Sequence, residues 1–566
     1  MRFFNFFSVL KKNEKKKFFF ISFFLLLTIF LEMVSLGLVI PFFSIILDYQ
    51  GSTFLNNLVN YIQINEKETL IIISSTLLVS AYLVKNILIY LFNATLNKFT
   101  TDIRARISSD IFFSYINKPY SFFLDKKKSH LINDISIEVP TFINSYLAPC
   151  FVIISEGLFL FALIALIFIF SNSFVIIFVI LIVIFVLIFF NFIKTKLKIL
   201  GEKRQIFNQN ILDNLTVGLQ NIKEAKIFGA EKFFHQNFDK NIWSLSDVEK
   251  KNMNFLIFPR HLFEVISILF LCIFVIIMTK SNISAENIVI SLAFFGAVGI
   301  RVIPLINRIV SAFQRIRYGK KAFQTVLFNI QEIKNNPISN NKIEVKDYVN
   351  KKINNIIFND VSFQIDQHKI LEKISLNLKS GDILGIKGES GSGKSTLVNL
   401  ILGFLKPTRG DILIDKEIYK NNLDILKNKT GYASNNPAIL DTTLEKNISY
   451  GRKHNQEKID RVIRLSQLVN VQKQLDGKKI GDNGNRLSEG QKQRIGIARA
   501  LYESPELIIL DEATNALDEN NESKILNELK NINNGDFIII LISHKKFTLS
   551  FCKKIYDLDT NSLQTS

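Results

Sequence analysis

Residues 388–396 read Gly-Glu-Ser-Gly-Ser-Gly-Lys-Ser-Thr, and this stretch decides how the last third of the chain folds. Its glycines let backbone N–H groups close around phosphates, Lys394 adds a positive charge, and the Ser395 hydroxyl can ligate Mg²⁺. Apolar residues predict a buried strand over 383–386 before the loop and a helix from Thr396 after it. The chain is therefore expected to bind a nucleoside triphosphate with Mg²⁺. The residues expected to hold it are Gly388, Glu389, Ser390, Gly391, Ser392, Gly393, Lys394, Ser395 and Thr396.

A second apolar run ends in two carboxylates. Leu507–Leu510 predicts a buried strand that is followed by Asp511 and Glu512. The first carboxylate can hold Mg²⁺, and the second can polarise the water that attacks the γ-phosphate. His544 follows a third apolar run, over 538–543, and is placed to contact the same phosphate. We expect ATP hydrolysis with Asp511 as a metal ligand and with Glu512 and His544 as catalytic residues.

A polar block upstream of these carboxylates predicts the start of a helix. Residues 487–494 read Leu-Ser-Glu-Gly-Gln-Lys-Gln-Arg. The N–H groups at a helix N-terminus attract anions, so this helix could meet a γ-phosphate that another copy of the domain binds. The domain and another copy of it would then bind ATP head to tail. The residues expected to act on the ATP of the other copy are Leu487, Ser488, Glu489, Gly490 and Gln491.

Together these blocks resemble the nucleotide-binding domain of the ABC ATPase family, an α/β P-loop domain, over residues 350–566. The resemblance implies that Ile365 replaces a Tyr that stacks on adenine and that Asn435 replaces a Gln that reaches Mg²⁺. The Asn435 amide oxygen can still ligate Mg²⁺, from a side chain one methylene shorter. Glu489 stands where the family usually has Gly, and Asn515 where it has Ser. Because the lysine, both carboxylates and the histidine are retained, we expect active hydrolysis.

The first 320 residues have a different composition. The chain has 566 residues, of which 48% are hydrophobic and 52 are Phe, and the longest apolar runs lie in its N-terminal part. Each run has at least the ~20 residues that a helix needs to cross a bilayer. We predict six transmembrane helices, near 16–48, 68–96, 141–170, 173–195, 252–279 and 285–318.

Basic residues predict the topology. Five Lys lie within residues 11–17, before the first run, whereas the loops 49–67, 171–173 and 280–284 hold few basic residues. Because cytoplasmic segments are enriched in Lys and Arg, both termini are expected in the cytoplasm and the protein in the cytoplasmic (inner) membrane. The net charge of +19 is then mostly a topology signal. Since no nucleic-acid recognition motif accompanies the charge, we expect no nucleic-acid partner.

Two segments between the predicted helices are long enough to leave the membrane. In the first, 97–139, each helical arm would span on the order of 25 to 30 Å at ~1.5 Å per residue. Short coupling helices are expected at the tips, near 120–125 and 210–214, with a return path that starts at 223–231. These tips would touch the ATPase domain.

Six spans followed by one ATPase resemble the half-transporter of the ABC exporters. The resemblance implies a helical membrane domain of the type IV exporter class, with six transmembrane helices, fused to an α/β P-loop ABC ATPase. The expected domains are the membrane domain at 1–320, a linker at 321–349 and the nucleotide-binding domain at 350–566. One membrane half with one ATPase implies a homodimer, in which each copy completes the ATP site of the other.

Ionisable residues within the predicted spans are candidate substrate contacts, because a charge at the centre of a bilayer costs roughly 2.5 to 3.5 kcal/mol on insertion scales. One interpretation is structural: Arg260 pairs with Glu264 at i,i+4, and Arg308 extends to the interface. The other is a basic belt that attracts an anionic head group, because Arg binds phosphates in a bidentate way. The candidate residues are Glu32, Lys85, Arg260, Arg301 and Arg308.

The same spans resemble the bacterial flippases of lipid-linked oligosaccharides. The similar motifs are Leu31-Glu32 with Pro41-Phe42, Pro259-Arg260 with Glu264, and Arg301-Val302-Ile303-Pro304 with Asn307-Arg308-Ile309. The resemblance implies ATP-driven transfer of a polyprenyl-pyrophosphate-linked oligosaccharide, or a related anionic glycolipid, from the cytoplasmic to the outer leaflet. An amphipathic stretch at 54–62 fits either a helix on the outer lipid surface, as such flippases carry, or a loop helix that packs on the protein's own spans. Two alternatives stay open: an exporter of lipid A-type lipids, hydrophobic drugs or peptides, and a non-transporting membrane ATPase with a degenerate nucleotide site.

Overall fold

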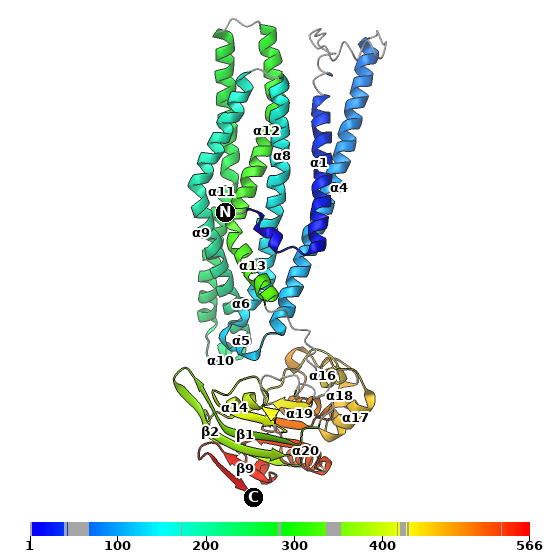
Figure 1. Cartoon of the computed structure of the whole chain (residues 1–566), viewed down its shortest axis with the longest axis vertical. Helices are drawn as coiled ribbons and strands as arrows, with labels where there is room; N and C mark the ends of the chain where they lie inside the picture. The colour runs from blue at the N-terminus through cyan, green and yellow to red at the C-terminus, as the bar shows by residue number, and fades with distance from the viewer. Residues whose placement is uncertain are drawn as a thin grey trace. The chain divides into compact units, whose positions relative to one another are not determined.

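The computed structural model describes residues 3–38, 42, 67–170, 173–280, 285–335, 352–415, 417–418, 426, 429–533 and 535–565. The chain forms two compact units, which are described separately (Figure 1). The helical unit comprises Met1–Lys118 and Asp125–Ile338. The sheet unit comprises Pro119–Leu124 and Ser339–Ser566.

Six long helices of the helical unit overlap the six predicted ranges, and several extend well beyond them. They are α1 (Lys12–Gly37), α4 (Lys67–Ile116), α8 (Ala148–Phe170), α9 (Ser173–Gln220), α11 (Glu231–Lys280) and α12 (Ala285–Tyr318). Helix α1 packs on α4, while α9 packs on α11 and α8 on α12 (Figure 1). The shorter elements are η1 (Phe3–Ser8), α6 (Lys128–Asn133), α7 (Val139–Phe142), α10 (Ile222–Ile227), α13 (Lys320–Asn335) and two π-helical stretches, η2 (Asp134–Glu138) and η3 (Ile143–Leu147).

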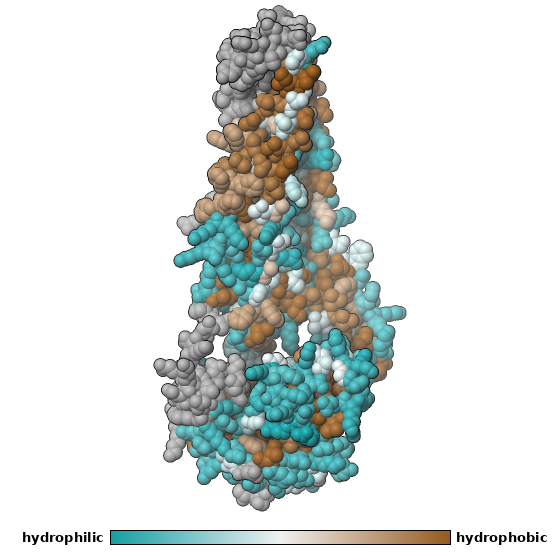
Figure 2. All heavy atoms as spheres, turned by 90° about the vertical axis from the view of Figure 1, so that its right-hand side faces the viewer, coloured by the Kyte–Doolittle hydropathy of each residue, from teal (hydrophilic) through white to brown (hydrophobic). Residues whose placement is uncertain are grey.

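The long helices expose apolar side chains. Within the described residues four stretches are long and apolar enough to cross a membrane: Lys12–Ser35, Glu68–Ile116, Lys128–Ile164 and Glu231–Ile277. Phe19, Phe30 and Phe161 are each about two-thirds or more exposed, and Figure 2 shows apolar residues gathered over the helices. Such a surface fits lipid and would be costly in water. The count of six spans stays a prediction.

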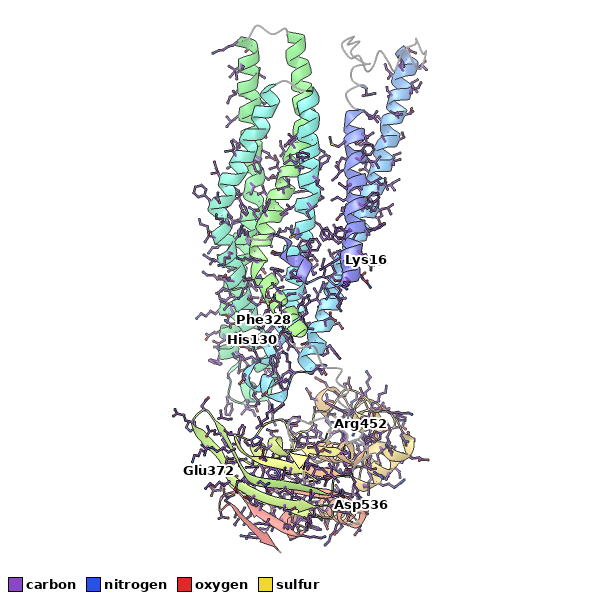
Figure 3. All side chains as sticks on the ribbon, in the orientation of Figure 1. Lys16, His130, Phe328, Glu372, Arg452 and Asp536 are labelled. Carbon is purple, nitrogen blue, oxygen red and sulfur yellow. The ribbon has the colours of Figure 1, made fainter. Side chains whose placement is uncertain are left out.

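The basic residues of the N-terminus lie at the start of α1. Lys16, labelled in Figure 3, is exposed and lies in the first turns of α1, next to the apolar run that begins at Phe18. Arg106 of α4 binds Glu14 there, with 2.7 Å between Nε and Oε1. This arrangement agrees with a cytoplasmic start of α1, which stays a prediction.

Short coupling helices were predicted at the tips of the two segments that leave the membrane, near 120–125 and 210–214. The structure bears out only the first. A short helix, α5 (Tyr120–Asp125), forms at the first tip as predicted, and its first residues group with the sheet unit. The prediction for the second tip was wrong, because residues 210–214 lie inside α9 and the short helix is α10, near residue 222. No Gly or Pro interrupts 210–214, whereas Gly229, with φ of 62°, turns the chain into α11. The predicted amphipathic stretch at 54–62 lies outside the described residues.

Helix α13 occupies the first part of the predicted linker and packs within the helical unit against α7 and α9. The buried carboxylate of Glu138 accepts a hydrogen bond of 2.8 Å from Arg204 of α9. The same guanidinium donates to Thr141 Oγ1 at 2.8 Å. A buried polar contact thus joins α9 to the π-helical stretch η2. The domain limits at 320 and 350 stay predictions.

The sheet unit contains two sheets. A four-stranded antiparallel sheet has the order β2-β1-β4-β5, from β1 (Asn355–Ile365), β2 (His368–Lys379), β4 (Arg409–Ile414) and β5 (Glu417–Ile418). A six-stranded sheet has the order β10-β9-β3-β8-β7-β6, from β3 (Ile383–Lys387), β6 (Thr430–Ser434), β7 (Leu507–Asp511), β8 (Ile538–Ile542), β9 (Lys554–Asp557) and β10 (Ser562–Thr565). Its helices are α14 (Lys394–Ile401), α16 (Leu444–Ser449), α17 (Gln456–Leu465), α18 (Val469–Leu475), η4 (Asp482–Gly484), α19 (Glu489–Leu501), α20 (Glu519–Ile532) and α21 (Lys546–Ser550).

The apolar runs that predicted strands form the centre of the larger sheet. Strands β3, β8, β7 and β6 are parallel neighbours, and β8 is buried along its whole length. Alternate residues of β8 enter separate apolar cores, Ile539 and Leu541 in one and Ile538 and Ile540 in the other. Strands buried on both faces explain why these runs are continuously apolar. Since parallel strands end at one edge, the loops after them meet there.

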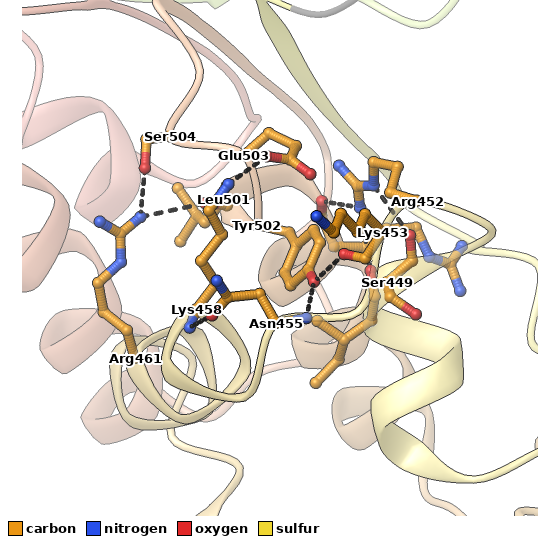
Figure 4. Close-up of polar contacts among 12 residues, drawn as sticks. Ser449, Arg452, Lys453, Asn455, Lys458, Arg461, Leu501, Tyr502, Glu503 and Ser504 are labelled. Carbon is orange, nitrogen blue, oxygen red and sulfur yellow. Dashed lines mark hydrogen bonds and ion pairs between the residues drawn. The ribbon is translucent and has the colours of Figure 1, made fainter.

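Hydrogen bonds join the C-terminal end of α19 to the segment before α17 (Figure 4). Tyr502 is fully buried, and its hydroxyl accepts a hydrogen bond from the Asn455 N–H at 2.9 Å and donates to the Lys453 carbonyl at 2.7 Å. The Arg452 guanidinium lies 4.9 Å from the centre of the Tyr502 ring. These contacts fix the position of α19, whose first turn carries the block predicted to act on the ATP of another copy.

Candidate nucleotide site

The phosphate-binding loop has a backbone that requires glycine. Gly393 is the N-cap of α14, with φ of 94°, and a Cβ there would lie 2.7 Å from Leu371 Cδ2 of β2. A side chain at this position would therefore be strained and would also clash. The strand–loop–helix arrangement predicted from the sequence is confirmed, with α14 beginning at Lys394.

The loop supplies the donors that a phosphate chain needs. Lys394 is largely buried, and its Nζ donates to the carbonyls of Gly388 at 2.8 Å and Glu389 at 2.7 Å. Ser392 Oγ is buried with no hydrogen-bond partner among the described residues. The first N–H groups of α14 have no partner within the helix. An orphaned hydroxyl beside a helix N-terminus and a lysine fits a bound triphosphate.

The carboxylate predicted to hold Mg²⁺ lies at the same edge of the sheet. Asp511 ends β7, in register with Ser434 of β6 and Ile542 of β8. Burial raises the pKa of Asp511, and the charge of Glu512 adds to this rise, while the Tyr432 hydrogen bond and Lys394 oppose it. The Asp511 carboxylate and the Ser395 hydroxyl are hard oxygen ligands of the kind Mg²⁺ prefers.

Tyr432 is a site residue that sequence reasoning missed. Its hydroxyl donates to Asp511 Oδ2 at 3.1 Å. The two residues are 79 positions apart in the chain, and only the pairing of β6 with β7 brings them together. Tyr432 lies three residues before Asn435 in the sequence, and nothing in that stretch gives the Tyr a role of its own.

Tyr432→Phe should move the acid limb of Mg²⁺-dependent ATP binding to higher pH. The hydroxyl stabilises the charged form of Asp511 and so lowers its pKa. Without it the carboxyl takes up a proton at higher pH, and the proton then competes with Mg²⁺. ATP binding with Mg²⁺, measured against pH, tests this. Tyr556→Phe, which removes a hydroxyl bonded to Asn561, is the matched control, and an acid limb equal to that of the wild type would contradict the role.

The predicted catalytic pair is brought together. Glu512 has a left-handed backbone, with φ of 52°, and its N–H donates to the Ile542 carbonyl at 3.1 Å. His544 Nε2 lies 3.5 Å from Glu512 Oε1. Asn515 Nδ2 donates to Glu512 Oε2 at 3.0 Å, so this departure from the family pattern orients the carboxylate. A strained backbone held in this way is typical of a functional position.

The block at 487–494 opens a helix, as predicted. Ser488 caps α19: its hydroxyl accepts from the Gln491 N–H at 3.2 Å, and Gln491 Oε1 accepts from the Ser488 N–H at 2.9 Å. Glu489 is exposed and pairs with Lys492 at 3.0 Å. Among the described residues no hydrogen bond joins this block to the phosphate-binding loop of the same chain. That its residues act on the ATP of a second copy stays a prediction.

The two positions that the resemblance assigned to adenine and Mg²⁺ have different surroundings. Ile365 is 52% exposed and lies opposite His368 in the tight turn between β1 and β2. Asn435 follows β6, and its side-chain oxygen accepts from Gln493 Nε2 at 2.8 Å. Sequence reasoning did not identify Gln493.

The basic candidate substrate residues are each paired with a carboxylate where the structure describes their side chains. Lys85 is buried on α4, with its Nζ 4.0 Å from Glu32 Oε1 of α1 and 4.4 Å from the centre of the Tyr82 ring. Arg260 Nε lies 3.6 Å from Glu264 Oε1, the i,i+4 pair of the structural interpretation. That interpretation holds for this pair.

Arg308 has a partner that sequence reasoning missed. Its Nε lies 2.7 Å from Glu156 Oε1, and its second nitrogen donates to Oε2 at 3.2 Å. This bidentate contact joins α12 to α8, yet the Arg308 side chain is 53% exposed. Arg301 lies on α12 as predicted, and its side chain is outside the described residues.

Comparisons with known proteins agree with both units. Residues 371–515 match the family described as ABC transporter, and residues 18–300, half of the chain, match the family described as ABC transporter transmembrane region. An ATP-dependent lipid A-core flippase of Francisella tularensis subsp. tularensis is 26% identical over 465 residues, which cover 80% of this chain and 75% of the relative. A "Probable ABC transporter ATP-binding/permease protein" of Haemophilus influenzae is 25% identical over 559 residues, 94% of this chain and 95% of the relative.

The fold has a counterpart among solved structures. The structure of a bacterial Atm1-family ABC exporter with ATP bound is similar, with a TM-score of 0.78, 21% sequence identity, and coverage of 97% of this chain and 95% of the other. The helical unit, the fold of the sheet unit and the geometry of the motifs therefore all agree with the matched families. The chain belongs to the ABC transporters, with a transmembrane region fused to one ABC ATPase domain, and it has the fold of an ABC exporter.

Proposed function

We propose that this exporter is a homodimeric flippase that uses ATP and Mg²⁺ to move an anionic glycolipid from the cytoplasmic to the outer leaflet of the cytoplasmic membrane. The proposed substrate is a polyprenyl-pyrophosphate-linked oligosaccharide. The observation that carries this proposal is the exposed, bidentate guanidinium of Arg308 within the helical unit. An Arg fork binds phosphate oxygens in the same geometry as carboxylate oxygens.

The homodimer part of the proposal rests on the two motif groups of the ATPase. Lys394, Asp511 and Glu512 gather at one edge of the sheet, whereas the helix start at Ser488 makes no hydrogen bond to the phosphate-binding loop in the described chain. A second copy would supply the missing N–H groups to the γ-phosphate. ATP binding would then close the two ATPase domains, and hydrolysis would reset them.

A lipid A-type glycolipid is the second candidate substrate. The relative in Francisella tularensis is named a lipid A-core flippase, and its alignment covers 80% of this chain. The two candidates share a charged head group on a lipid and differ in the lipid and glycan. Transport tests with both molecules decide between them.

The decisive experiment is ATP-dependent translocation in proteoliposomes, with undecaprenyl-pyrophosphate oligosaccharide and lipid A as separate probes and Glu512→Gln as the inactive control. Movement of the first lipid by wild type alone supports the proposal. Movement of lipid A alone assigns the second candidate. Hydrolysis without movement of either lipid overturns the glycolipid assignment and favours a drug or peptide substrate, and absence of hydrolysis favours a non-transporting membrane ATPase.

Arg308→Lys should lower lipid-stimulated ATPase activity and translocation by about tenfold, because it keeps the charge and removes the bidentate fork. Arg308→Ala, alone or with Arg301→Ala, should lower both further. The rates are compared as a function of lipid concentration. Asp247→Ala, which breaks the exposed pair with Lys251 on α11, is the matched control. Unchanged transport in the Arg308 variants would assign this residue to a structural ion pair with Glu156.

A further inference from the structure

One buried amide of the ATPase joins three segments of the site. Gln493 lies in the second turn of α19 and is 2% exposed. Its Nε2 donates to the Asn435 carbonyl at 3.0 Å and to Asn435 Oδ1 at 2.8 Å, and its Oε1 accepts from the Ala516 N–H at 2.9 Å. Both donors and the acceptor of the amide are thus used.

On one side, Gln493 fixes the loop after β6. Asn435 is the position that the family resemblance assigns to Mg²⁺, and its side chain is one methylene shorter than the usual Gln. Its Oδ1 accepts one hydrogen bond from Gln493 and keeps a second lone pair, since an amide oxygen has two. The bond to the Asn435 carbonyl also holds the backbone, so both the rotamer and the loop are set by one neighbour.

On the other side, Gln493 fixes the loop after β7. Ala516 follows Asn515, whose amide holds the Glu512 carboxylate. Gly490 packs against the same loop, where a Cβ would lie 2.8 Å from the Ala516 carbonyl. The start of α19 therefore contacts the segment that orients the residue expected to polarise water.

We propose that Gln493 is a positioning residue of the ATPase reaction. It holds the Asn435 amide oxygen for Mg²⁺ and holds the loop behind Glu512 through Ala516. Because both bonds come from one rigid amide, a shift of α19 moves the metal side and the water side of the site together. The proposal concerns the ATP site alone and does not depend on which lipid is transported.

The test uses the difference of one methylene between the two amides. Gln493→Asn shortens one side of the contact and Asn435→Gln lengthens the other, while the double variant exchanges the two lengths. In full-length protein that also carries Glu512→Gln, ATP affinity is measured with Mg²⁺ and with EDTA. The Mg²⁺ gain is the ratio of ATP affinity with Mg²⁺ to ATP affinity in EDTA. In each single variant this ratio should fall about tenfold, while the affinity in EDTA stays unchanged. The double variant should recover most of that gain.

Gln493→Glu is the second variant, because it keeps the shape and the acceptor for Ala516 and loses the donors for Asn435. It should lose the Mg²⁺ gain, and its unfolding temperature in EDTA should also fall, because a carboxylate would be buried beside the two Asn435 oxygens. Gln456→Asn, which shortens an exposed amide on α17, is the control. A Mg²⁺ gain that is intact in the single variants, or that the exchange does not restore, would overturn the proposal and leave Gln493 with a packing role.

Discussion

Glu512→Gln should stop ATP turnover and leave ATP bound. The substitution keeps the contact with Asn515 and removes the negative charge that polarises the attacking water. A general base contributes about 10²- to 10⁴-fold to rate, so kcat should fall by that amount. The phosphate-binding loop is untouched, and the closed dimer should therefore accumulate with ATP. Steady-state hydrolysis and retention of labelled ATP after rapid desalting measure the two effects.

The matched control is Glu457→Gln, which removes an exposed carboxylate in the first turn of α17, within the same unit. It should leave kcat within twofold of wild type, by about the margin that surface substitutions allow. Near-normal hydrolysis in Glu512→Gln would remove this residue from the catalytic role. Lost hydrolysis without retained ATP would contradict the closed, ATP-bound state.

Glu138→Ala should destabilise the helical unit by about 3–5 kcal/mol, the cost of leaving a buried charge without its partner. Glu138 is completely buried and Arg204 nearly so, and 2.8 Å separates Oε2 from the guanidinium. Arg204 would keep only Thr141 as a hydrogen-bond acceptor among these residues. The loss should appear as a lower unfolding temperature of the detergent-solubilised protein.

Replacing both partners, as Glu138→Leu with Arg204→Met, should recover most of the loss, because a buried pair is often replaced by apolar residues without cost. Lys198→Ala, which breaks an exposed pair with Glu202 on α9, should change stability by less than about 1 kcal/mol. Equal effects of Glu138→Ala and Lys198→Ala would show that the buried pair does not hold α9 to η2.

The fold was largely readable from local patterns. Periods of apolar residues and the loop at 388–396 identified β3, α14, β7 and the long helices, because each depends on neighbours along the chain. The second coupling helix was predicted at the wrong residues, because α9 continues through 210–214, where every residue tolerates a helix. A helix end that is set by one Gly further along leaves little trace at the expected position.

The long-range contacts of the site residues could not be predicted from local sequence patterns. Tyr432, Gln493 and Glu156 each contact a residue more than 50 positions away. Nothing in the chain near Asp511 indicates Tyr432, because their contact depends on the register of β6 with β7. Glu156 lies in an apolar run, and its contact with Arg308 depends on how α8 packs against α12.

The sequence by itself determined which chemical groups this transporter has: a phosphate-binding loop, two carboxylates after a strand, a histidine, a capped helix start and long apolar helices. These are local patterns, and their physical causes act over a few residues. Tertiary structure alone decided how the groups are held. Strand register placed Tyr432 on Asp511, helix packing placed Glu156 on Arg308, and the buried amide of Gln493 tied Asn435 to Ala516. Such contacts form only when distant segments fold together, because hydrogen bonds and ion pairs require their partners within about 3–4 Å.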